Sequence, residues 1–157
     1  MMGAEMDMES RPGAGSTFRF TVLLTRSKTA AALPESANDL SGLRVLIVED
    51  NPANCAILER YVGTCGMVSA AADRGERALA MLHEAVARRA PYDVALIDMK
   101  MPGMNGIELA QAIRSEAALR ATHLIMLTSL TSRDMAASAR DAGFAACLNK
   151  PVHREEL

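Results

Sequence analysis

The chain has 157 residues, 50% of them hydrophobic and 23% charged, with a formal net charge of −2. This length suits about one domain with a smaller fragment, and the core must be aliphatic because only 3% of the residues are aromatic. The charges form no basic stripe and no apolar run approaches about 20 residues, so neither nucleic-acid binding nor membrane contact by this chain is expected. A cytoplasmic location is predicted, within a parent protein that can itself carry a membrane anchor.

Residues 1–25 predict a β-hairpin with its turn at residues 11–16. Hydrophobic side chains alternate with polar or small ones on both arms, which is the period of a half-buried strand. These side chains are Met6, Met8, Phe18, Phe20, Val22 and Leu24. Two strands alone are marginally stable in water, so we expect the hairpin to be the remnant of a sheet that the chain does not contain. Residues 26–42 mix Ser, Thr, Ala, Pro, Asn, Asp and Gly without a period, which predicts a linker.

From residue 43 onward, short apolar runs alternate with segments of helical periodicity. The predicted strands are residues 43–48, 67–71, 94–98, 123–128 and 145–149. Regular alternation of this kind predicts an α/β fold, with a five-stranded, doubly wound parallel sheet that carries helices on both faces. The crossovers between its strands are expected to be right-handed.

Four helices are predicted from apolar residues that recur three or four positions apart. Asn51 and Pro52 suit the N-cap and the first position of the first helix. The apolar stripes are Leu58, Val62 and Cys65 in the first helix, Leu79, Leu82 and Val86 in the second, Ile107, Ala110 and Ile113 in the third, after a turn at Gly106, and Met135, Ala139 and Ala142 in the fourth. Gly143 suits the end of the fourth helix, and residues 153–157 suggest the first turn of a fifth, truncated helix.

Polar side chains occur where four of the predicted strands end. Glu49 and Asp50 follow the first strand, Asp98 ends the third, Thr128 ends the fourth, and Lys150 follows the fifth. In an open α/β sheet, this edge is where ligands bind. Alone, Glu49–Asp50 could be a helix cap and Asp98 a turn residue, but the joint pattern at four strand ends predicts a functional site.

Four motifs, at residues 48–51, 98–103, 127–129 and 149–151, resemble those of the receiver domains of bacterial two-component response regulators. The resemblance covers residues 43–157 and implies the flavodoxin-like receiver fold, with strand order 2-1-3-4-5 and an incomplete last helix. Residues 49–54 look most like receivers attached to hybrid sensor histidine kinases. Residues 2–18 resemble the end of a kinase ATP-binding domain, so residues 1–25 are expected to be the C-terminal hairpin of such a domain.

The resemblance implies that Asp98 accepts a phosphoryl group from phosphohistidine, with a hydroxyl donor from Thr128 and a positive charge from Lys150. Three neighbouring carboxylates repel one another unless a cation lies among them, and Mg²⁺ suits such a site. The implied Mg²⁺ ligands are Asp50, Asp98, the backbone carbonyl of Met99, and Glu49 directly or through water. The implied partners are a histidine-kinase phosphodonor domain in the same parent chain and a separate histidine phosphotransfer domain. The Lys150–Pro151 peptide bond is expected to be cis, as in the family.

One position departs from the family pattern. Cys147 stands three residues before Lys150, where receivers usually carry the aromatic ring of their conformational switch. We expect Thr128 still to move toward the phosphoryl group, with the output carried by the loop after its strand.

Other functions remain to be weighed against this interpretation. The alternative is a pseudo-receiver, a protein-interaction module that takes no phosphate. A phosphatase of the haloacid dehalogenase type is disfavoured because Lys100 stands where that family has a second Asp. A Rossmann-type nucleotide binder is disfavoured because Glu49–Asp50 replaces the glycine-rich loop. The chain alone is not expected to be a kinase, whereas its parent is expected to be a protein-histidine kinase.

Overall fold

The computed structural model describes residues 5–11, 15–21, 40–129 and 133–153. The chain divides into two compact units, residues 1–37 and residues 38–157. The predicted fifth helix lies almost entirely outside the described residues, as do Val22, Leu24 and most of the predicted linker.

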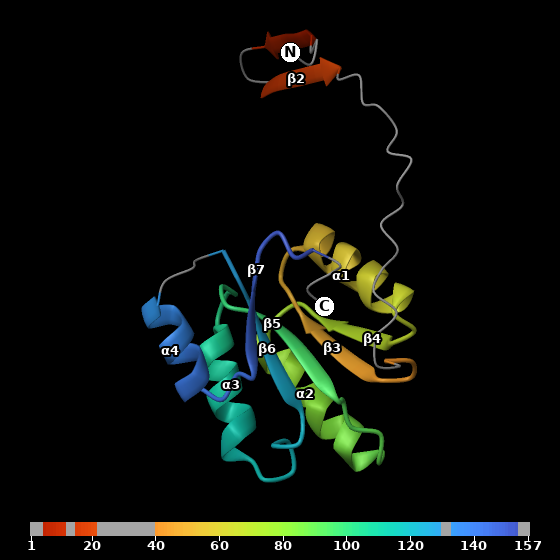
Figure 1. Cartoon of the computed structure of the whole chain (residues 1–157), viewed down its shortest axis with the longest axis vertical. Helices are drawn as coiled ribbons and strands as arrows, with labels where there is room; N and C mark the ends of the chain where they lie inside the picture. The colour runs from red at the N-terminus through yellow and green to blue at the C-terminus, as the bar shows by residue number, and fades with distance from the viewer. Residues whose placement is uncertain (1–4, 12–14, 22–39, 130–132, 154–157) are drawn as a thin grey trace. The chain divides into compact units, whose positions relative to one another are not determined.

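The first unit is an antiparallel hairpin of β1 (Glu5–Arg11) and β2 (Gly15–Thr21) (Figure 1). The register pairs Met8 with Phe18, and each of these residues is 58% exposed. The turn is shorter than predicted because Arg11 already pairs with Gly15, which has a φ of 91° that favours glycine. The predicted hairpin is therefore present, and its apolar face is accessible at Met8 and Phe18.

The second unit is built on a five-stranded parallel sheet. Its strands are β3 (Arg44–Val48), β4 (Val68–Ala72), β5 (Val94–Asp98), β6 (His123–Thr128) and β7 (Ala146–Asn149). They lie in the order β4-β3-β5-β6-β7, which is the predicted order 2-1-3-4-5 within this unit (Figure 1). The predicted doubly wound α/β fold is confirmed, and each predicted strand boundary is within one residue of the observed one.

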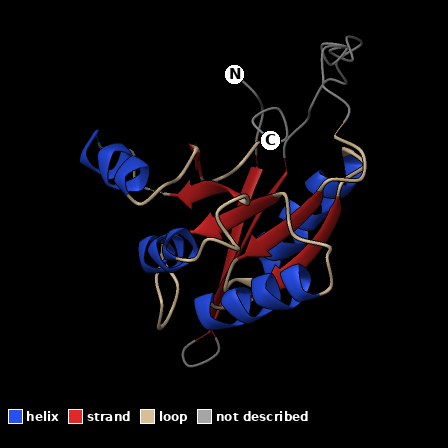
Figure 2. Cartoon of the chain, turned by 90° about the horizontal axis from the view of Figure 1, so that it is seen from below, coloured by secondary structure: helices blue, strands red, loops and turns tan. Residues whose placement is uncertain are grey.

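Helices cover both faces of this sheet (Figure 2). In the described residues they are α1 (Pro52–Thr64), α2 (Gly75–Ala87), α3 (Gly106–Ser115) and α4 (Arg133–Asp141). Leu58 and Val62 of α1 pack against Ile47 on one face, whereas Leu46 and Val48 point to the opposite face, which α2, α3 and α4 cover. The alternation of side chains along β3 thus divides the core into two layers.

At the start of α3 and the end of α1, the helix caps set boundaries that differ from the predicted ones. The sequence predicts a turn at Gly106, but Gly106 is the first residue of α3. Asn105 precedes it as the N-cap, and its side chain and that of Glu108 each accept a hydrogen bond from the other's backbone N–H, at 3.0 and 2.9 Å. Cys65, predicted in the stripe of the first helix, is the C-cap residue of α1, because the chain turns at Gly66 with a φ of 77°.

Small side chains occupy some of the buried positions of the helices. In α2, Ala78 and Ala85 are buried, whereas Leu79 and Val86 of the predicted stripe are half-buried. At the end of the predicted linker, the N–H of Gly42 donates to the carbonyl of Gly66 at 2.9 Å.

Candidate functional site

The polar residues predicted at the strand ends lie at one edge of the sheet. Asp98 is the last residue of β5 and Thr128 the last of β6, and they are only 7% and 4% exposed. Glu49, directly after β3, is 3% exposed. Lys150 follows β7 and is half-buried, whereas Asp50 is exposed. The parallel sheet brings together residues that are up to 101 positions apart in the chain.

Backbone hydrogen bonds hold these residues in register beyond the strands themselves. The N–H of Glu49 donates to the carbonyl of Ala72 at 3.0 Å, and that of Met99 donates to Leu127 at 3.0 Å. The N–H of Lys150 donates to the carbonyl of Thr128 at 2.8 Å. The side chains of the site therefore project from a fixed backbone.

Three carboxylates and one ammonium form the centre of the site. Oxygens of Glu49, Asp50 and Asp98 all lie within 4.8 Å of one another. Lys150 Nζ lies 2.5 Å from Oε2 of Glu49 and 2.9 Å from Oδ2 of Asp98. Burial alone lowers the pKa of Lys150, but its contacts with the two carboxylates raise the pKa by more, so its ammonium stays charged. Among these four side chains, two negative charges remain unbalanced.

The start of α1 holds the Glu49 carboxylate. Oε1 of Glu49 accepts hydrogen bonds from the backbone N–H of Asn51 at 3.3 Å and from Nδ2 of Asn54 at 3.1 Å. Asn51 is the N-cap of α1, as predicted, and its Oδ1 accepts from the N–H groups of Ala53 and Asn54. The contact of Asn54 with Glu49 is not among the sequence-based predictions. Its position in the first turn after an acidic strand end is the signal that could have suggested it.

The start of α3 packs directly on Asp98. A Cβ on Gly106 would lie 2.5 Å from the backbone oxygen of Asp98 and 3.0 Å from the Cα of Met99, so only glycine fits there. The N–H of Gly106 donates to the carbonyl of Met99 at 3.1 Å. A carbonyl oxygen has two lone pairs, so that of Met99 keeps one for a further ligand.

Two residues that the sequence connects with a conformational switch lie on β6 and β7. Oγ1 of Thr128 lies 3.8 Å from Sδ of Met99, within hydrogen-bond distance for sulfur. Cys147, which stands at the position of the usual aromatic ring, is exposed on β7. The Lys150–Pro151 peptide bond is cis, as expected.

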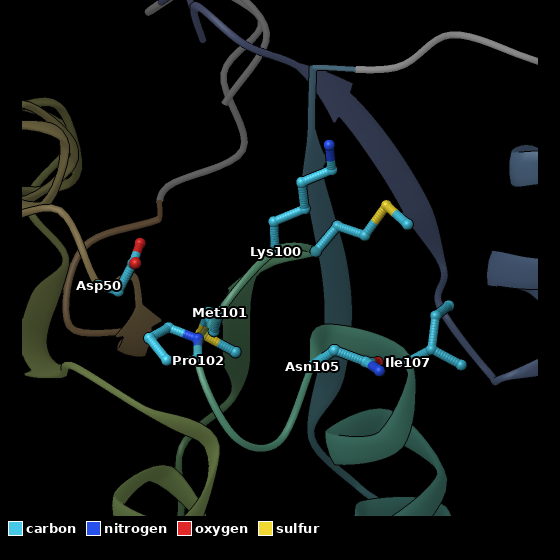
Figure 3. Close-up of a pocket in the computed structure, with 7 residues that line it drawn as sticks. Asp50, Lys100, Met101, Pro102, Asn105 and Ile107 are labelled. Carbon is cyan, nitrogen blue, oxygen red and sulfur yellow. The ribbon is translucent and has the colours of Figure 1, made fainter.

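A hollow opens beside the loop after β5. Figure 3 shows it between Asp50, whose carboxylate rises from the loop after β3, and Asn105 and Ile107 at the start of α3. Lys100 and Pro102 form its wall. The exposed Asp50 side of the cluster is therefore open to small molecules from solvent.

The donor set fits a hard divalent cation. The three acidic side chains offer carboxylate oxygens, Met99 offers a carbonyl oxygen, and Asp50 is open to solvent for retained waters. Mg²⁺ favours carboxylate oxygens together with retained waters, and its charge matches the two unbalanced negative charges.

Comparison with known proteins connects this arrangement to a family. The response regulator receiver domain family matches residues 45–157. The virulence sensor protein BvgS of Bordetella bronchiseptica is 36% identical over 100% of this chain. The sensor histidine kinase AruS of Pseudomonas aeruginosa is 34% identical over 99% of it. The chain spans only 13% and 15% of the lengths of these two relatives.

A solved structure is similar in the second unit. The receiver domain of a sensor histidine kinase from Pseudomonas aeruginosa, with a magnesium ion coordinated in its active site cleft, is 28% identical with a TM-score of 0.63. The match covers 74% of this chain and 91% of that one. Among the described residues of this chain, the helices are all too short or too polar to cross a membrane.

Proposed function

The chain belongs to the response regulator receiver domain family, and from this premise we propose that Asp98 is its phosphoacceptor. The observation that carries the proposal is the contact of Lys150 with both Asp98 and Glu49, at 2.9 and 2.5 Å, in a cluster of three carboxylates. A structural ion pair needs one carboxylate for one ammonium, whereas this cluster keeps an excess of negative charge at an edge that solvent reaches. Such an excess of negative charge is energetically unfavourable unless a bound cation neutralises it.

In the proposed reaction, a carboxylate oxygen of Asp98 attacks the phosphorus of a phosphohistidine. An O–P bond forms and the N–P bond breaks, and its electron pair stays on the imidazole nitrogen of the donor. Lys150 neutralises charge on a phosphoryl oxygen, and the hydroxyl of Thr128 donates a hydrogen bond to another. The close fit of Gly106 on Asp98 fixes the attacking group in position.

Glu49, Asp50, Asp98 and the Met99 carbonyl would hold Mg²⁺. When bound, the ion supplies neutralisation of the negative charge that spreads over the phosphoryl oxygens. Glu49 and Lys150 keep each other oriented, which holds the ammonium near Asp98.

We place the domain in a hybrid sensor histidine kinase, with residues 1–25 as the end of a kinase ATP-binding domain and residues 26–42 as a linker. Similarity to BvgS and AruS along almost the whole chain supports this, as does the exposed apolar pair Met8 and Phe18 on a two-stranded hairpin. The phosphodonor is then a histidine of the parent kinase. The phosphoryl group would pass from Asp98 to a histidine phosphotransfer domain.

Intact mass spectrometry after incubation with acetyl phosphate and Mg²⁺ tests the assignment of Asp98. We expect one added phosphoryl group on the wild type and none on Asp98→Asn. Asp141→Asn, at an exposed position of α4, is the matched control and should be phosphorylated like the wild type. A folded wild type that takes no phosphoryl group would instead support the pseudo-receiver alternative.

A further inference from the structure

We propose that Asn54 is a positioning residue that sets the affinity of the site for Mg²⁺ through Glu49. The inference rests on the proposed function for the identity of the site. It assigns a role to a residue that the phosphoryl chemistry itself does not require. Its basis is the way in which the two oxygens of the Glu49 carboxylate are divided between partners.

Glu49 links the start of α1 to the acceptor. Its Oε1 accepts from the Asn54 amide at 3.1 Å, and its Oε2 pairs with Lys150 at 2.5 Å. Lys150 in turn lies 2.9 Å from Asp98. A chain of hydrogen-bonded side chains therefore runs from Asn54 to the attacking carboxylate, and Glu49, at 3% exposure, is its buried middle member.

The amide of Asn54 is not needed to begin the helix. Asn51 already caps α1, with its Oδ1 accepting from the N–H groups of Ala53 and Asn54. Asparagine is also a poorer helix former than alanine, so its presence at this position has a small cost for α1. The interaction that offsets this cost is the donation of Nδ2 to Glu49.

Of the two donors to Oε1 of Glu49, the Asn54 amide is the nearer, at 3.1 Å. The second donor to Oε1, the N–H of Asn51, is longer, at 3.3 Å. Without the Asn54 amide, the carboxylate can rotate toward Lys150, and both of its oxygens can then pair with the ammonium. A Glu49 oxygen engaged in this way is withdrawn from the cation, which weakens binding. Partners of metal ligands commonly change metal affinity by about 10- to 100-fold when they are removed.

The test is the dissociation constant of Mg²⁺ for the 157-residue chain, measured by isothermal titration calorimetry. We expect Asn54→Ala to raise this constant by about 10-fold, at the lower end of the usual range because Asn54 is only half-buried. The melting temperature without Mg²⁺ should change by only a few degrees, because the helix propensity that alanine gains offsets part of the lost hydrogen bond to Glu49. Asn54→Gln, which keeps an amide, should restore part of the affinity. Glu59→Gln, at an exposed position of the same helix, should leave the affinity unchanged.

A double-mutant cycle identifies the route of the effect. If Asn54 acts through Glu49, adding Asn54→Ala to Glu49→Ala changes the dissociation constant by less than about twofold. The same fold-change in both backgrounds overturns the inference, as does an unchanged constant in Asn54→Ala alone. A wild type that binds Mg²⁺ but takes no phosphoryl group refutes the proposed function and leaves these comparisons valid. A wild type that binds no Mg²⁺ overturns both.

Discussion

Helices α3 and α4 pack on the same face of the sheet beside the site, yet different interactions hold them. Helix α3 begins with the capping box of Asn105 and Glu108 and buries both Leu109 and Ile113 completely. In the described part of α4, Ala139 is fully buried, whereas the largest apolar side chain, Met135, is only half-buried. Core packing therefore anchors α3 firmly and α4 much less.

Hydrogen bonds from Arg114 compensate for the limited burial of α4 at its C-terminal end. Arg114, near the end of α3, donates to the carbonyl of Gly143, just after α4, at 2.9 and 3.2 Å. It also donates to the carbonyls of Arg120 and Thr122 at 2.8 and 3.1 Å. Burial of the guanidinium lowers the pKa of Arg114.

The difference between the two helices matters for signalling. Elements that move are drawn from the less stable parts of a fold, and those that position a reacting group must be rigid. Gly106 of α3 touches the backbone of Asp98, whereas α4 follows the strand that ends in Thr128. The packing therefore suits α3 for holding Asp98, the proposed acceptor, and α4 for responding to its phosphorylation.

The largest expected effect tests the packing difference directly. Ile113→Ala should lower the free energy of unfolding by about 3 kcal/mol, because a fully buried isoleucine leaves a cavity. Met135→Ala should lower it by only about 1 kcal/mol, since part of that side chain is already in water. Urea denaturation of both variants gives the comparison. Equal losses would mean that α4 is as firmly packed as α3.

The next effect concerns the contact between α3 and Asp98. Gly106→Ala should cost about 2 kcal/mol and slow phosphorylation by acetyl phosphate, because the new methyl group would overlap the Asp98 backbone. Gly63→Ala in α1 is the control, since a Cβ there meets no atom within 4 Å. Alanine at that position should stabilise the chain by about 0.5–1 kcal/mol. A normal phosphorylation rate in Gly106→Ala would argue against tight positioning by α3.

A smaller loss is expected at the end of α4. Arg114→Ala should cost about 1.5 kcal/mol, because partly buried carbonyls lose a charged donor. Hydrogen exchange should accelerate in α4 and β7 and remain slow in β3. Arg88→Ala removes an exposed ion pair with Glu84 and should change stability by less than about 0.5 kcal/mol. Uniform acceleration across the sheet would show that Arg114 supports the whole domain rather than α4.

The sequence predicted the fold and the acidic residues for a physical reason. Each of them is adjacent to an apolar strand, and parallel topology alone brings strand ends together. Asp98 and Lys150 could thus be assigned to one edge without knowledge of any contact. The same reasoning placed Thr128 there, and the strand boundaries followed from the limits of the apolar runs.

Residues whose partners are set by tertiary packing could not be predicted in this way. Arg114 binds backbone carbonyls up to 29 positions away, and no side-chain pattern encodes such partners. Gly106 suited a turn as well as a helix start. The capping box of Asn105 and Glu108 makes it the first residue of α3, and its close approach to Asp98 is set by the fold. Asn54 had a weak local signal, because its partner Glu49 is five positions away across a helix start.

The smallest expected effect tests whether the response of α4 needs an aromatic ring. Cys147 is exposed on β7, so Cys147→Tyr should change the free energy of unfolding by less than about 0.5 kcal/mol. Thr128 is buried, and its carbonyl accepts a hydrogen bond from the N–H of Lys150. A movement of Thr128 on phosphorylation can therefore reach β7 through the backbone. We therefore expect phosphorylation to change hydrogen exchange in α4 equally in the wild type and in Cys147→Tyr.

Ala146→Tyr is the matched control for that experiment, because neighbouring strand residues point to opposite faces of the sheet. If Cys147→Tyr alone enlarges the phosphorylation-dependent change in α4, the native domain is poorly coupled and a ring restores the link. If neither variant changes it, the limited burial of α4 is sufficient for the response. The difference between the two helices would then account for the direction of signalling without an aromatic switch.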